Sequence, residues 1–133
     1  MPTPGRRSTV FASAAGFTAV ALGAFGAHAL RPLLEARGSL PTWATAVQYH
    51  LLHSVVLLAL ALYLHRETPP RIARRLNSAS ALFASGIALF SGSLYLLALG
   101  GPHWLGPVTP LGGLCLLAGW LAVGHALWRR EET

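Results

Sequence analysis

Between Ala44 and Leu64 the chain reads ATAVQYHLLHSVVLLALALYL, a run of 21 residues without one charged side chain. An α-helix of about 20 residues is long enough to cross the hydrocarbon core of a bilayer, which is roughly 30 Å thick. Polar and apolar residues do not alternate here at the period of two that a membrane β-strand requires. The run therefore predicts a transmembrane helix.

Three more runs of similar length lack charged side chains, and they cover residues 9–30, 79–99 and 108–127. In lipid only helices and closed barrels satisfy all of their backbone polar groups, and none of the runs alternates like a barrel strand. We predict an all-α membrane protein. Residues 1–133 are expected to form a single domain, a compact antiparallel bundle of four transmembrane helices.

The composition excludes several other classes of protein. Of the 133 residues, 53% are hydrophobic and 11% are charged, whereas soluble domains carry about 25% charged residues. The single cysteine, Cys115, excludes an intrachain disulfide. The sequence pI is near 11.1, but the basic residues form short clusters between apolar runs rather than an aromatic-interleaved face. We therefore expect no nucleic-acid partner.

The ten basic residues, all arginines, are distributed unevenly between the two sides of such a bundle. The first connection holds Arg31 and Arg37, and the third connection holds none. Eight fall on the other side: Arg6, Arg7, Arg66, Arg71, Arg74, Arg75, Arg129 and Arg130. Because cytoplasmic loops are enriched in basic residues, we predict that both termini are cytoplasmic. Arg71, Arg74 and Arg75 are also candidates for contacts with anionic lipid head groups.

The first run has a rival interpretation as a secretory signal. Arg6 and Arg7 precede an apolar run, and Ala27-His28-Ala29 resembles a cleavage site. However, a signal normally has an apolar region of only about 7–15 residues, and this run is longer. We expect it to be retained as the first span.

Small residues recur at helical spacing and predict close contacts between helices, because apolar burial alone gains little in lipid. The packing glycines expected from these stripes are Gly16, Gly23, Gly92, Gly112 and Gly119.

Polar residues inside the spans gather toward the outer side of the predicted bundle. Such residues are costly in lipid, so each needs a partner or a function. Gln48 and Tyr49 are expected to point elsewhere. The remaining residues form a candidate polar cluster: His28, His50, His53, Ser91, Ser93, Tyr95 and Thr109.

This cluster supports two interpretations of different kinds. One is structural, with hydrogen bonds that join helices. The other is a metal or haem site, because imidazole binds transition metals and haem iron. His50 and His53 share a helix face, and depth favours His28 with His50 as the ligand pair. A pathway for a small solute or a lipid is a third, weaker interpretation.

Catalysis is not expected. The four acidic residues, Glu35, Glu67, Glu131 and Glu132, all lie outside the spans. No carboxylate is therefore available in the membrane to orient a histidine in a Ser-His-acid arrangement. The same absence argues against proton-coupled transport.

Several motifs, in order along the chain, resemble the domain-of-unknown-function 423 family. They are residues 23–30 (GAFGAHAL), 49–53 (YHLLH), 90–95 (FSGSLY), 109–113 (TPLGG) and 119–120 (GW). The resemblance covers roughly residues 9 to 127. It implies a small four-span protein of a bacterial inner membrane, with eukaryotic relatives, and it carries over no catalytic residues.

The sequence as a whole favours a structural or interaction protein of the membrane. The expected partners are the lipid bilayer and either a second copy of the chain or another membrane protein. The alternative is a metal- or haem-binding module that uses His28, His53 and His50.

Overall fold

The computed structural model describes residues 4–128, and most of this part of the chain is helical. The elements follow one another as α1 (Pro4–Ala27), α2 (Arg31–Ala36), α3 (Leu40–Leu64), α4 (Pro70–Gly86), η1 (Ile87–Ser91), α5 (Gly92–Ala98), η2 (His103–Leu105) and α6 (Val108–Trp128). The segment η1 is π-helical, and it joins α4 and α5 into one continuous rod. Within the described residues, four helical spans are long and apolar enough to cross a membrane.

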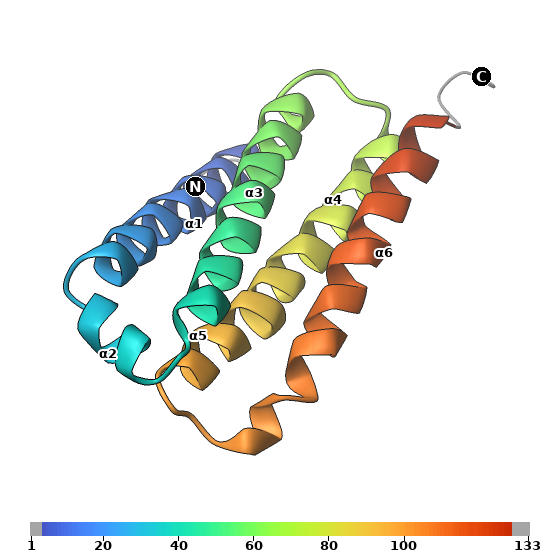
Figure 1. Ribbon diagram of the computed structural model, residues 1–133. Coiled ribbons are helices and arrows are strands. Elements are labelled where there is room, and N and C mark those ends of the chain that lie inside the picture. The colour runs from blue at the N-terminus through green and yellow to red at the C-terminus, as the bar shows by residue number, and fades with distance from the viewer. Residues whose placement is uncertain (1–3, 129–133) are drawn as a thin grey trace.

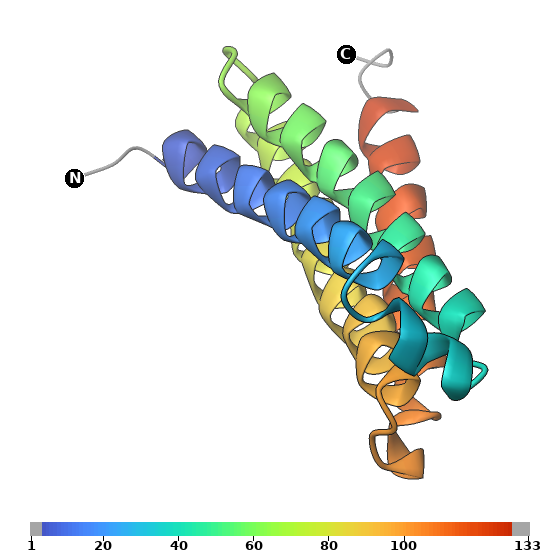
Figure 2. The ribbon, with the colours of Figure 1, turned by 60° about the vertical axis from the view of Figure 1, so that its left-hand side comes forward.

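The spans form two helix pairs that meet along the middle of the molecule (Figure 1). Helix α1 packs on α3, α6 packs on α4 and η1, and α3 joins the two pairs through its contacts with η1 and α5. Figure 2 shows that α1 runs obliquely across α3. The start of α1, the α3–α4 connection and the end of α6 lie at one end, whereas α2 and η2 lie at the other.

The predicted fold class is confirmed, but several helix boundaries differ from the prediction, and the first helix begins at Pro4 rather than at residue 9. The first helix ends at Ala27 rather than at residue 30, and Pro32 lies in the first turn of the short helix α2. Proline is well suited to a first helical turn because its missing N–H would have no partner there.

The third span is longer than predicted. It begins at Pro70 rather than at residue 79, because the arginines of its first turns do not interrupt the helix. Arg71 and Arg74 are exposed on this helical end, and Arg75 is half-buried. A charge-free run therefore marks the part of a helix that lies in hydrocarbon, and the helix itself continues into the interface. The second and fourth helices begin or end within four residues of their predicted limits.

Two apolar clusters form the core at opposite ends of the bundle. The cluster near the α3–α4 connection centres on Phe83, which is fully buried between Leu57 and Leu116. The cluster at the other end is formed by Leu34, Trp43 and Ala98. The indole N–H of Trp43 donates to the carbonyl oxygen of Leu22 at 3.0 Å, which fastens α3 to the end of α1.

Four of the five predicted packing glycines lie against a neighbouring helix. A methyl group at Gly112 would overlap the backbone of Phe90, and one at Gly119 would meet the ring of Phe83. Methyl groups at Gly23 and Gly16 would lie 3.2 Å from Val47 and 3.9 Å from Ser54, respectively.

The prediction for Gly92 is wrong, because a Cβ at that position would have no neighbour within 4 Å. Gly92 directly follows the π-helical turn. A π-turn holds more residues than an α-turn, so it rotates the following residues away from the face that α-helical spacing predicts.

A buried polar layer as the candidate functional site

Buried polar side chains form a layer between the two apolar clusters. Its members are between 1% and 7% exposed, and we call them the polar layer: His50, His53, Ser54, Ser91 and Ser93. Because α3 begins at Leu40, His50 and His53 lie about 15 and 20 Å along the helix, at a rise of about 1.5 Å per residue. Counted from Ala44, where the charge-free run begins, His53 lies about 13 Å into the span, so the layer extends from the outer half of the predicted bundle toward its middle.

His50 connects three helices. Its Nδ1 lies 3.1 Å from the hydroxyl of Tyr95 on α5, and its Nε2 lies 3.5 Å from the Oγ1 of Thr18 on α1. The Thr18 hydroxyl in turn contacts carbonyl oxygens of its own helix at 2.9 and 3.0 Å. The imidazole thus bridges α1 and α5 from its position on α3.

His53 is held by a hydrogen bond at each ring nitrogen. Its Nδ1 lies 2.7 Å from the carbonyl oxygen of Tyr49, which can only accept, so Nδ1 carries the proton. The Nε2 is then free to accept from the indole N–H of Trp120 at 3.2 Å. This pair of bonds favours one neutral tautomer and leaves no ring lone pair for a metal ion.

Aromatic rings surround His53 on the side of α4 and α6. Its ring centroid lies 5.5 Å from that of Phe83 and 6.1 Å from that of Trp120, which lie 5.5 Å from each other. Rings at these distances gain a modest stabilisation beyond simple burial. The Trp120 side chain therefore packs on Phe83 of α4 and also links α6 to α3 through its hydrogen bond to His53.

Two serines of the polar layer join the third span to its neighbours. The hydroxyl of Ser91 donates to the carbonyl oxygen of Ala46 at 2.8 Å, and Ser93 shares a hydrogen bond of 2.7 Å with Thr109. Ser54 instead donates to the carbonyl oxygen of His50, within its own helix. The π-helical turn ends at Ser91 and determines the directions in which Ser91 and Ser93 point.

His28 does not join the polar layer, contrary to the cluster predicted from sequence. It lies exposed in the turn after α1, where it lines a shallow hollow with Phe25. Although His50 and His53 share a helix face, they hydrogen-bond to different residues, His50 to Tyr95 and His53 to Trp120. Among residues 4–128, no three His, Cys, Asp or Glu side chains are grouped closely enough to hold a metal ion. The predicted ligand set of His28, His50 and His53 is therefore not assembled.

Three contributors to the layer were missed by the sequence analysis: Thr18, Ser54 and Trp120. Thr18 and Ser54 are single hydroxyls within apolar runs, a pattern that often marks a polar contact in a membrane helix. Trp120 was noted only within a motif, and no feature of the sequence pairs it with His53. Gln48 is exposed, but Tyr49 does not point away from the layer as expected, because its ring stacks on that of His53 with centroids 5.9 Å apart.

These features define a class of protein: an integral membrane protein of four helical spans whose buried polar side chains are hydrogen-bonded within the bundle. The chain belongs to the family described as protein of unknown function DUF423, whose model matches residues 22–113. The family resemblance in the sequence motifs is thereby confirmed.

Relatives of this chain occur in several bacteria. It is 41% identical to the UPF0382 inner membrane protein YgdD of Escherichia coli K12 over 124 residues. The aligned residues cover 92% of this chain and 91% of the relative. It is 39% identical over 118 residues to a UPF0382 membrane protein of Haemophilus influenzae, covering 88% and 90%. YwdK, a UPF0382 membrane protein of Bacillus subtilis, is 38% identical over 105 residues, covering 79% and 82%. No solved structure matches the chain.

Proposed function

We propose that this protein is a non-catalytic structural and interaction protein of the inner membrane. One observation carries the proposal: among the described residues, every fully buried side-chain nitrogen and oxygen has a hydrogen-bond partner. The polar layer thus connects α1, α3, the third span and α6, and it leaves no orphaned buried group pointing toward a substrate. Lipid and other membrane-embedded chains are the partners that the outer apolar faces suit.

The arrangement of titratable groups supports a role without catalysis. Both nitrogens of His53 and both nitrogens of His50 lie within hydrogen-bonding reach of neighbouring groups. All four carboxylates of the chain lie outside the predicted spans. An acid–base pair in the membrane would have to be built without a carboxylate to orient the imidazole.

The proposed orientation has both ends of the chain in the cytoplasm. Six of the eight arginines that support it lie at one end of the bundle, and Arg129 and Arg130 lie outside the described residues. A reporter that is active only in the cytoplasm should be active when it is fused after residue 133. A reporter that is active only outside the cytoplasm should be active when it is inserted in the loop near Trp104. The reverse pattern would overturn the orientation.

A direct test of the structural role is the visible spectrum and metal content of the purified protein. We expect a colourless protein without stoichiometric metal, and we expect His53→Ala to lower its thermal stability in detergent. His28→Ala is the matched control, because His28 is exposed and should be neutral. A haem band or bound metal that is lost in His53→Ala would instead favour the binding-module alternative.

Cross-linking in native membranes tests the interaction role. A membrane-permeable cross-linker should capture defined complexes, either with a second copy or with another membrane protein. If the protein is captured only as a monomer at native abundance, the interaction role is rejected.

A further inference from the structure

A groove runs along the membrane-facing side of the bundle between α1 and α4. Among the described residues, α1 packs extensively against α3 but not against α4, so a space stays open between the two helices. Two hollows of about 320 and 300 Å³ occupy this space, and they share Phe11 and Ala84 in their linings. They therefore form one continuous groove, which we call the α1–α4 groove.

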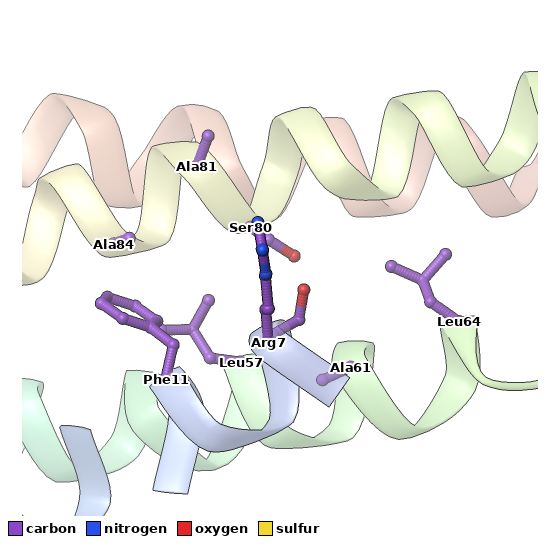
Figure 3. Close-up of a pocket in the computed structure, with 9 residues that line it drawn as sticks. Arg7, Phe11, Leu57, Ala61, Leu64, Ser80, Ala81 and Ala84 are labelled. Atoms are coloured by element: carbon purple, nitrogen blue, oxygen red, sulfur yellow. The ribbon is translucent and has the colours of Figure 1, made fainter. Parts of the chain in front are cut away.

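The walls and floor of this groove are mostly apolar. Phe11 and Ala84 form opposite walls, and Leu57 of α3 forms part of the floor (Figure 3). The polar exceptions lie toward the two ends of the groove. Three of them lie toward the end near the α3–α4 connection, namely Arg7, Ser8 and Ser80, whereas Thr18 and His50 lie at the other end.

The length of the groove matches one leaflet of a bilayer. Arg7 and Thr18 are eleven residues apart on α1, which corresponds to about 16 Å at the rise of an α-helix. Half of a hydrocarbon core of roughly 30 Å is about 15 Å. The groove therefore extends from the membrane surface to its middle, where the contact of His50 with Thr18 closes it.

Charge at the open end favours an anionic head group. Figure 3 shows the Arg7 side chain extending from α1 into the groove toward α4. Arg6 borders the adjoining hollow, and the first turns of α4 carry Arg71, Arg74 and Arg75. Glu67 in the α3–α4 connection is the one acidic residue at this end within residues 4–128.

We infer that the α1–α4 groove binds an anionic phospholipid, with its phosphate at Arg7 and one acyl chain along the groove as far as His50. A second copy in the same orientation would bring another cluster of arginines to the same level, and the two clusters would repel each other. A phosphate at that level instead neutralises part of the charge. Naming the cytoplasmic leaflet rests on the proposed orientation, which the reporter fusions test separately.

The test uses the full-length protein in nanodiscs of phosphatidylcholine and phosphatidylglycerol. The phosphatidylglycerol carries a diazirine near the end of one acyl chain, and peptide mass spectrometry locates the adducts after irradiation. We expect adducts to concentrate on the segments around Thr18 and Ala88, which line the inner part of the groove. Phosphatidylcholine with the same label should give far fewer adducts there.

Arg7→Gln should lower the adduct yield about five-fold, which corresponds to the roughly 1 kcal/mol that one surface arginine contributes to binding anionic lipid. Arg66→Gln, which removes the same charge at the same end but outside the groove, should leave the yield near that of the wild type. Ala84→Phe should block the groove and abolish the adducts. Ser85→Phe is its matched control, since Ser85 is exposed and does not line the groove.

Two results would overturn the inference. Adducts spread evenly over all four spans, with no difference between the two lipids, would mean that unselected bulk lipid fills the groove. Efficient disulfide cross-linking between copies that each carry a single cysteine, either Phe11→Cys or Ala84→Cys in a Cys115→Ser background, would mean that a second copy occupies it. Because Arg7 is exposed, Arg7→Gln keeps the test valid even if Ala84→Phe fails to fold.

Discussion

The indole N–H of Trp120 on α6 donates a hydrogen bond to Nε2 of His53 on α3, over a donor–acceptor distance of 3.2 Å. The two residues are 67 positions apart in the chain. Their bond joins the two helix pairs near the middle of the membrane, where water cannot substitute for a missing partner. It also fixes His53 as an acceptor at Nε2, because Nδ1 already donates to Tyr49.

Trp120→Phe should lower the free energy of unfolding by about 1 kcal/mol, the typical value of an interhelical hydrogen bond in membranes. The substitution keeps an aromatic ring beside Phe83 but removes the N–H donor. Thermal unfolding in detergent micelles measures the loss. Trp104→Phe is the control, because Trp104 is 68% exposed in η2 and should have little effect. Equal losses in the two variants would contradict a role for the hydrogen bond.

Gly112→Ala should destabilise the protein by about 1–3 kcal/mol, the usual cost of overpacking a tight contact. A methyl group there would overlap the backbone of Leu89 and Phe90, which can shift only if the third span moves away from α6. Gly92→Ala should instead stabilise the protein by about 0.5–1 kcal/mol, because alanine favours a helix over glycine and the position is open. Denaturant titration of both variants measures these opposite signs, and equal signs would count against the packing described here.

Ser93 and Thr109 should be energetically coupled by about 0.6 kcal/mol, the average for such pairs in membrane proteins. A double-mutant cycle with Ser93→Ala and Thr109→Val measures the coupling, since their hydroxyls are 2.7 Å apart. Ser80→Ala combined with Thr109→Val is the control cycle. Ser80 donates within its own helix, to the carbonyl oxygen of Leu76, so the control effects should add. Additive effects in the first cycle would show that the pair contributes nothing.

The fold could be predicted because charge-free runs report directly on the hydrocarbon thickness. The run that ends at Leu64 ends where α3 ends, and the fourth run differs from α6 by one residue at its end. The predicted helix limits were wrong where a helix extends beyond the hydrocarbon core. There Arg71 and Arg74 are tolerated, and Pro32 can begin a helix as readily as it ends one.

The polar layer could be predicted only in part. Depth along ideal helices brought Ser91, Ser93 and Thr109 to a common level, and two of these do bond to each other. The same reasoning misplaced His28, because the turn after Ala27 takes that residue out of the first helix and exposes it. The partners Thr18 and Trp120 depend on helix rotation, which a π-helical turn alters and which residue spacing cannot report.

The π-helical turn itself leads to a final prediction. Because a π-turn accommodates one residue more than an α-turn, deletion of Leu89 should convert Ile87–Ser91 to an α-helix without rotating α5 relative to α4. Deletion of Ala81, within the regular helix α4, should rotate everything beyond it by about 100°. The first deletion should therefore keep residue 93 facing residue 109, and the second should separate them. Disulfide formation between Ser93→Cys and Thr109→Cys, in a Cys115→Ser background, distinguishes the two. If both deletions abolish the disulfide equally, the π-turn is not a one-residue insertion that the bundle can lose.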